Sequence, residues 1–210
     1  MLGLIKKDFL MLKGNFKTWL ILLFVYIVMA FQESMSLTFL LPFMCVVTML
    51  STFSYDSYNK WDAYVCSLPD GRKNSVRAKY IATLLLVFVT VLITTILTII
   101  ISYYRTNTVN LSSIGESIFG AIFATTLLQS IMYPAIYKYG VEKARITIFI
   151  VIFGTALVGG VLSKYIDFEF IIQRLVFLEK YIMIIIPVVI VVMVYISYRI
   201  SEAIYKRKEY

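Results

Sequence analysis

Histidine is absent from the 210-residue sequence, and cysteine occurs only twice. Without histidine, the chain has no His-based proton relay, no His metal site and no His-dependent catalytic triad. The two cysteines, Cys45 and Cys66, fall in a predicted membrane span and in a predicted loop, so no disulfide framework is expected. We therefore expect no metal site on this chain.

Charged residues are also scarce, at 15% of the chain, and none lies in the middle of a predicted span. Glu33, Glu116 and Lys164 stand at span edges. Because acids and bases inside a membrane usually mark ion pathways, their absence argues against a self-powered secondary transporter. The chain also lacks the G-x-x-x-x-G-K-[ST] phosphate loop. We therefore expect no nucleotide or other cofactor on this chain, and an energy source on another protein.

Hydrophobic residues make up 60% of the sequence, and the mean hydropathy is +0.86. Several apolar runs approach or exceed the ~18–20 residues that cross a ~30 Å hydrocarbon core as a helix, and they lack the period-two alternation of a β-barrel. The sequence therefore predicts an all-α integral membrane protein with six spans. These are Phe16–Phe31, Leu37–Phe53, Tyr80–Tyr104, Ser117–Tyr137, Ile146–Ser163 and Tyr181–Tyr198.

The positive charges predict the orientation. With both termini in the cytoplasm, the inside segments hold sixteen of the 20 lysines and arginines. The outside segments keep four, which are Arg105, Lys164, Arg174 and Lys180. By the positive-inside rule, we expect a multi-pass protein of the plasma membrane with both termini in the cytoplasm. The net charge of +8 then indicates affinity for anionic membrane lipids rather than for nucleic acid.

The first span is the weakest prediction, because Lys17 lies in its first turn and must extend toward the headgroups. The basic flank and the run Val28-Met29-Ala30 are also typical of a cleaved secretory signal peptide. The short Gln32–Ser36 link into a second apolar run favours a retained helical hairpin.

Some polar and pliable side chains are candidates for a substrate path through the membrane. Gln129 and Ser130 either line such a path or hydrogen-bond between helices. Methionines and phenylalanines of the second span either form a pliable apolar lining or pack in the core. The candidate path residues are Phe39, Phe43, Met44, Met49, Phe53, Gln129 and Ser130.

Two further patterns concern helix geometry. Three prolines, Pro42, Pro134 and Pro187, fall within predicted spans, where each either kinks its helix or is tolerated. Small residues recur four positions apart in the fifth span and allow close helix packing. They are Thr155, Gly159 and Ser163, and Ala156 and Gly160.

The longest cytoplasmic segment between spans is Ser54–Lys79, which contains "NKWDAYVCSLPDGRK". Asp56 is a possible cap for a short helix over Asn59–Cys66, and Pro69-Asp70-Gly71 is a strong turn signal. The next residues, Arg72–Lys79, continue as a cytoplasmic extension of the third span. On these patterns alone, the segment either contacts another protein or only sets the topology.

The same segment resembles the first cytoplasmic loop of type-2 ATP-binding-cassette (ABC) transporter permeases. The matching residues are Tyr55 to Asp62, Ser67-Leu68-Pro69, Arg72-Lys73 and Ala78-Lys79-Tyr80. The chain most resembles the small six-span branch that includes the phenol-soluble modulin exporter permeases. The order of an N-terminal amphipathic segment, six spans and this loop covers the whole chain as a single permease domain, residues 1–210.

The resemblance implies an interfacial elbow helix within residues 1–15 and a coupling helix within the cytoplasmic coupling loop, residues 54–79. In the elbow, Leu2, Ile5, Phe9 and Leu12 would face lipid, and Lys6, Lys7 and Lys13 the headgroups. The coupling helix, over Tyr58–Ser67, would contact a separate ATPase subunit that holds ATP and Mg. The implied contact residues are Tyr58, Asn59, Lys60, Trp61, Asp62, Tyr64, Val65, Leu68, Pro69 and Arg72.

The resemblance also gives a role to residues 164–180, where apolar positions at helical spacing indicate an outer interfacial segment. That segment either caps the exit of the path or only anchors the chain. The implied function is the non-catalytic permease subunit of an ABC exporter, paired with a second permease copy or a paralogue, with ATP hydrolysis by the separate subunit. Its substrate would be amphipathic or hydrophobic, such as a peptide. The alternative is a membrane scaffold or sensor without a transported substrate.

Overall fold

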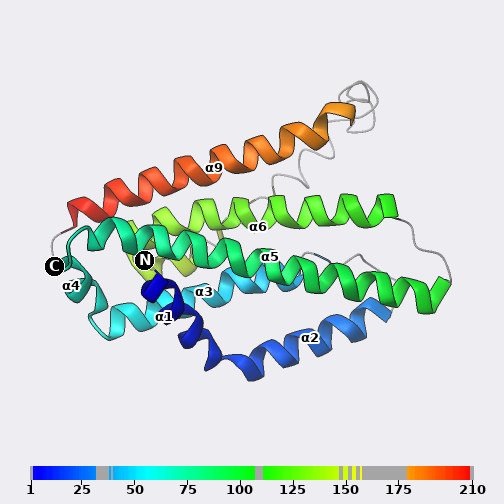
Figure 1. Ribbon diagram of the computed structural model, residues 1–210, viewed down its shortest axis with the longest axis horizontal. Helices are drawn as coiled ribbons and strands as arrows, with labels where there is room; N and C mark the ends of the chain where they lie inside the picture. Colours follow the sequence, from blue (N-terminus) through cyan, green and yellow to red (C-terminus); the bar gives the residue numbers. More distant parts are fainter. Residues whose placement is uncertain are drawn as a thin grey trace.

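The computed structural model describes residues 2–31, 38, 40–106, 111–146, 149–150, 153–154, 157 and 179–208, and the regular structure in these residues is helical. The long helices run lengthwise along the molecule, and both termini lie at one end (Figure 1). The helices are α1 (Leu2–Lys13), α2 (Phe16–Phe31), α3 (Leu40–Tyr58), α4 (Trp61–Cys66), α5 (Gly71–Thr106), α6 (Leu111–Tyr139) and α9 (Glu179–Arg207).

Three of the described helices are long and apolar enough to cross a membrane. They lie within α5, α6 and α9, over Gly71–Tyr104, Ile114–Tyr139 and Ile185–Arg207. A fourth is counted if α1 and α2 form one span, but they are bent by 68° at the break between them. Most of the predicted fifth span lies outside the described residues, as does the outer segment up to residue 178. The last two residues of that segment, Glu179 and Lys180, begin α9.

The third predicted span and its cytoplasmic extension form the single helix α5, as expected. The second predicted span differs, because α3 begins at Leu40 and continues to Tyr58, five residues beyond the predicted end at Phe53. Pro42 consequently lies in the first turn of α3, where its missing N–H has no partner to lose. Pro134 and Pro187 lie inside the continuous helices α6 and α9.

An aromatic cluster joins four helices near the end that holds the termini. Phe53 of α3 and Tyr80 of α5 both meet the buried Tyr133 of α6 edge to face, with ring centroids 5.1 and 4.9 Å apart. Tyr137 of α6 meets Tyr205 of α9 at 5.2 Å. Such edge-to-face contacts each contribute ~0.5–1.5 kcal/mol beyond area burial. The cluster thus fixes the relative positions of α3, α5, α6 and α9.

The amphipathic N-terminal helix is present as α1, but its two faces are not distributed as predicted. Leu12 does not face lipid, because it is buried against Met49 of α3 and Ala82 of α5. Lys7 does not face the headgroups either. Its side chain turns inward to Asp56 of α3. Periodicity predicts the apolar spacing of α1, but the packing of α1 on α3 and α5 decides which of its residues are covered.

Candidate functional site

The cytoplasmic segment between α3 and α5 folds into the short helix α4, which is set off by left-handed residues on both sides. Lys60 precedes α4 with φ 51°, and Asp70 precedes α5 with φ 54°. The prediction that Asp56 caps this helix is wrong, since Asp56 belongs to α3, which ends only at Tyr58. The predicted helix Tyr58–Ser67 is therefore shorter, because a sharp turn at Asn59 and Lys60 separates α3 from α4.

Gly71 allows α4 and α5 to approach closely. A Cβ atom at this position would lie 1.9 Å from the carbonyl oxygen of Val65, which no side chain can tolerate. Val65 itself is fully buried, and its carbonyl accepts the backbone N–H of Leu68 at 3.1 Å. The turn after α4 is thus tight, and it requires a glycine where α5 begins.

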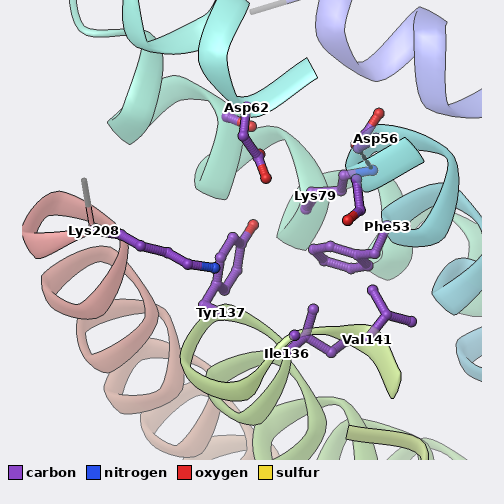
Figure 2. A pocket seen from close by; sticks show the side chains of 11 residues that line it. Phe53, Asp56, Asp62, Lys79, Ile136, Tyr137, Val141 and Lys208 are labelled. Carbon is purple, nitrogen blue, oxygen red and sulfur yellow. Dashed lines mark ion pairs between the residues drawn. The ribbon is translucent and has the colours of Figure 1, made fainter. Parts of the chain in front are cut away.

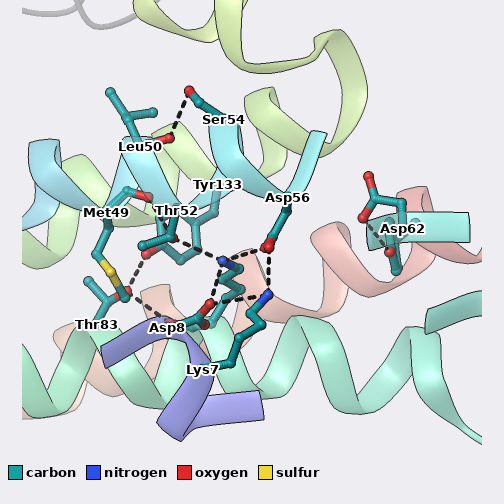
Figure 3. Close-up of polar contacts among 12 residues, drawn as sticks. Lys7, Asp8, Met49, Leu50, Thr52, Ser54, Asp56, Asp62, Thr83 and Tyr133 are labelled. Atoms are coloured by element: carbon teal, nitrogen blue, oxygen red, sulfur yellow. Dashed lines mark hydrogen bonds and ion pairs between the residues drawn. The ribbon is translucent and has the colours of Figure 1, made fainter. Parts of the chain in front are cut away.

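Beside α4, two lysines and two aspartates form a buried ion cluster that joins three helices (Figure 3). Lys79 Nζ of α5 lies 2.8 Å from Asp8 Oδ1 of α1 and 2.7 Å from Asp56 Oδ2 of α3. Lys7 Nζ lies 2.5 Å from Asp56 Oδ1. Lys79 also donates to Thr52 Oγ1 at 2.9 Å. We call Lys7, Asp8, Asp56 and Lys79 the ion cluster.

The ion cluster is shielded from solvent and balanced in charge. The side chains of Lys79, Asp8 and Asp56 are only 4%, 2% and 7% exposed, and that of Lys7 is 19% exposed. Removing one member of a buried pair leaves an uncompensated charge and typically costs ~3–5 kcal/mol. The two positive and two negative groups balance each other, so removal of any single member leaves a net charge in a buried site.

Trp61 connects α4 to this cluster. The ammonium of Lys7 lies 4.4 Å from the centroid of the Trp61 ring, within the range of a cation–π contact. Trp61 also packs against Tyr64, with ring centroids 5.1 Å apart. The first residue of α4 is therefore in contact with α1, which is itself bound to α3 and α5 through the ion cluster.

The other side of α4 is bound to the end of α9. The hydroxyl of Tyr205 donates to Asp62 Oδ1 at 2.8 Å. Arg72, at the start of α5, donates from Nη1 to the carbonyl of Lys206 at 2.6 Å and from Nε to the sulfur of Cys66 at 3.2 Å. A displacement of α4 must therefore move α1, α5 and α9 or break these contacts.

The predicted ATPase-contact residues fall into an exposed group and an inward group. Tyr58, Tyr64 and Leu68 are 86%, 56% and 40% exposed, so they present apolar surface away from the bundle. Val65 is buried, and Trp61, Asp62 and Arg72 are only partly exposed. Trp61 contacts α1, and Asp62 contacts α9. Arg72 contacts both Cys66 at the end of α4 and Lys206 of α9. The exposed polar and turn residues are Asn59, Lys60 and Pro69.

A small polar cavity of about 60 Å³ lies behind α4, between the ends of α3, α5, α6 and α9 (Figure 2). Asp62 and Lys79 line it, and the buried hydroxyl of Tyr137, which points toward Asp62, has no hydrogen-bond partner among the described residues. The volume suits a few water molecules, which need polar partners of this kind. The described residues contain no group of three or more His, Cys, Asp or Glu side chains that suits a metal ion.

The candidate path residues lie in different parts of the bundle. Met49 packs against α1, Phe53 lines the polar cavity, and Gln129 is fully buried in α6. Phe43 and Met44 are half-buried, Ser130 is half-buried with its hydroxyl covered, and Phe39 lies outside the described residues. The amide of Gln129 has no hydrogen-bond partner in the described part of the chain, so the interhelical hydrogen bond considered for it is not formed here.

The ion cluster was not predicted from the sequence. Sequence patterns predict Lys7 and Lys79 as headgroup or topology charges and Asp56 as a helix cap, and they predict no role for Asp8. One signal was present, because Asp8 interrupts the apolar and basic pattern of α1 with an acidic residue. Nothing in the spacing shows that residues 8, 56 and 79 meet, since the contacts depend on how α1 crosses α3 and α5.

One family model, described as "ABC-2 family transporter protein", matches residues 3–206. No curated protein and no solved structure matches the chain. The matched segment includes every described helix except the first residue of α1 and the last residue of α9. The chain therefore belongs to the ABC-2 family of transporter proteins.

Proposed function

We propose that this chain is the membrane-spanning permease subunit of an ABC exporter. ABC-2 permeases are membrane transport components that generally work with a separate ATPase and do not catalyse hydrolysis themselves. In this proposal, six spans cross the plasma membrane with both termini in the cytoplasm, and α1 is the interfacial elbow. Two permease chains, identical or paralogous, pass an amphipathic or hydrophobic substrate such as a peptide out of the cell.

One observation carries the proposal. The segment around the short helix α4 presents Tyr58 at the end of α3, Tyr64 in α4 and Leu68 just after α4 outward. On its other side, Trp61 contacts Lys7 of α1 and Asp62 contacts Tyr205 of α9. A helix with exposed apolar surface on one side, and contacts to α1, α5 and α9 on the other, is suited to transmit a movement of a partner protein to the bundle. We therefore propose α4 as the coupling helix, and an ATPase that holds ATP and Mg as its partner.

We assign different roles to the two aromatic residues of α4, Trp61 and Tyr64. Because Lys7 covers one side of the Trp61 ring, Trp61 positions α4. Tyr64 is more than half exposed and is the proposed anchor on the ATPase. Truncating a central aromatic anchor at a protein interface typically costs ~2 kcal/mol or more.

The test is co-purification of the ATPase that is encoded beside this chain or identified by pull-down from the same cells. Tyr64→Ala is expected to weaken its retention by about 30-fold, at ~1.4 kcal/mol per tenfold, with normal membrane insertion. Tyr104→Ala is a matched control, since that tyrosine is 79% exposed at the far end of α5. Equal retention by Tyr64→Ala, Tyr58→Ala and wild type would remove α4 as the ATPase contact, and would favour a scaffold without a transported substrate.

A further inference from the structure

Beyond the permease function, a groove of about 410 Å³ lies between α5 and α9 and has apolar walls. It extends about 10 Å along α5 from Arg77 to Leu84, at ~1.5 Å per residue. The walls consist of one face of each helix. They are Tyr80, Ile81 and Leu84 on α5, and Ile190, Val191, Val194, Tyr195 and Tyr198 on α9.

The end of the groove nearest the chain termini is positively charged. Arg77 lines the groove, and Arg199 follows Tyr198 on α9. Both guanidinium groups act electrostatically on the Tyr198 hydroxyl. Both arginines are exposed, and neither forms an ion pair with the residues that the structure describes. The acidic neighbour is Glu202, whose carboxylate is bound by Lys206 at 2.7 Å. Arg77, Arg199 and Lys206 thus lie near the single carboxylate of Glu202, which leaves this end of the apolar groove with an excess of positive charge.

Hydrogen bonds at the base of the groove hold α5 and α9 together, so the groove is a fixed feature of the fold. The hydroxyl of Tyr80, which forms the floor, contacts Ser197 Oγ at 2.6 Å and Ser201 Oγ at 2.9 Å. Arg72 adds a contact to the carbonyl of Lys206. These bonds hold α5 and α9 together at their charged ends, while farther along Leu84 and Val191 remain exposed.

We propose that this groove binds an anionic phospholipid of the leaflet nearest the chain termini. The phosphate lies between Arg77 and Arg199, and the upper part of an acyl chain lies along the aliphatic wall of α5 and α9. Basic pockets between membrane helices attract anionic headgroups, at about 1 kcal/mol for each Lys or Arg near the surface. Tyr195, which is 61% exposed, lies one helical turn before Arg199, and exposed tyrosines of membrane proteins favour the headgroup region.

Charge also argues against a second copy of the chain in the groove. In a twofold contact the same patch faces itself, so Arg77 and Arg199 of both copies would come together without a counter-charge. A free phosphate would satisfy the arginines but would leave the apolar walls uncovered. Only a molecule with an anionic head and an apolar tail matches both parts of the groove.

The test uses the full-length protein in mixed micelles that contain either phosphatidylglycerol or phosphatidylcholine, with native mass spectrometry as the measure of bound lipid. Wild type is expected to retain phosphatidylglycerol preferentially. Arg77→Gln is expected to weaken this retention about fivefold, which corresponds to the loss of one ~1 kcal/mol contact. Val194→Trp keeps both arginines but fills the groove, and it is expected to lower retention as well. Lys6→Gln, which removes one exposed cation from α1, is the control for net charge.

Three kinds of result would overturn the proposal. The first is a lack of specificity, seen either as equal retention of the two lipids by wild type or as equal losses in Arg77→Gln and Lys6→Gln. The second is displacement of phosphatidylglycerol by glycerol phosphate, which would indicate a free-anion site. The third is an efficient disulfide between two Val191→Cys chains in native membranes, which would place a second copy in the groove. Arg77→Lys keeps the positive charge and should therefore retain phosphatidylglycerol better than Arg77→Gln.

Discussion

Lys79 and Asp8 form a 2.8 Å ion pair although 71 positions separate them in the chain. The pair connects the N-terminal helix α1 to the long helix α5 at the level of Asp56, where α3 ends. Trp61, the first residue of α4, lies beside the same cluster under Lys7. The charges that look like topology signals in the sequence thus also hold the proposed coupling helix in place.

Removing the Lys79 charge should destabilise the protein more than removing a whole pair. Lys79→Met leaves two buried carboxylates with one lysine, and we expect a loss of about 3–5 kcal/mol. The double variant Lys79→Met, Asp8→Leu leaves Lys7 with Asp56, which are 2.5 Å apart, and should recover much of the loss. Unfolding in a sodium dodecyl sulfate titration, followed by circular dichroism, measures both. A double variant that is less stable than Lys79→Met would show that charge balance is not what stabilises the cluster.

Gly71→Ala should disrupt the junction of α4 and α5. The new methyl group would lie 1.9 Å from the Val65 carbonyl oxygen, so the turn must shift. We expect a loss of stability of about 2 kcal/mol or more, as for other overpacked sites, together with loss of ATPase retention. Gly3→Ala is a suitable control, because a Cβ atom there meets nothing within 4 Å. If the two variants behave alike in thermal unfolding and pull-down, the close approach is not needed.

Gln129→Leu should make the resting protein more stable. Both polar atoms of the Gln129 amide are buried without a partner in the described chain, and such groups cost about 1–3 kcal/mol. If Gln129 lines the substrate path, transport should nevertheless fall in this variant, because the substrate would lose a hydrogen bond to the amide. Thermal unfolding and vesicle transport measured on one preparation separate the two effects. Gained stability with unchanged transport would leave Gln129 without a role in the path.

Cysteine labelling tests the orientation. In a background without Cys45 and Cys66, a cysteine at Thr106 should react with a membrane-impermeant thiol reagent in intact cells. One at Lys143 should react only after lysis, because sixteen of the 20 cations would lie on its side. Labelling of Lys143→Cys in intact cells would reverse the proposed topology.

The energy supply is tested with purified components. The chain has no phosphate loop, so the chain alone should not hydrolyse ATP. It has no acid in the middle of a predicted span, so reconstituted transport with its ATPase should be insensitive to a proton gradient. Proton-driven transport by this chain alone would contradict the ABC mechanism.

The sequence by itself determined the membrane class, the amphipathic α1, the continuous α5 and the turn around Asp70-Gly71. These depend on local properties: the length of apolar runs, 3.6-residue periodicity, and residues that favour turns. Family membership followed from a match over residues 3–206, and the loop pattern around Trp61 had already indicated it. The end of α3 was predicted five residues early, because polar residues such as Asp56 look like a loop when their partners are unknown.

Only the tertiary structure decided which charges are buried and which side of α4 is free. The sequence predicts Lys7 and Lys79 as surface cations. In the structure, the crossing of α1 over α3 and α5 brings them to Asp8 and Asp56. The same crossing turns Trp61 inward and leaves Tyr64 exposed. A charge can be buried only where an opposite charge meets it, and that meeting depends on contacts between residues far apart in the chain, which local sequence patterns do not record.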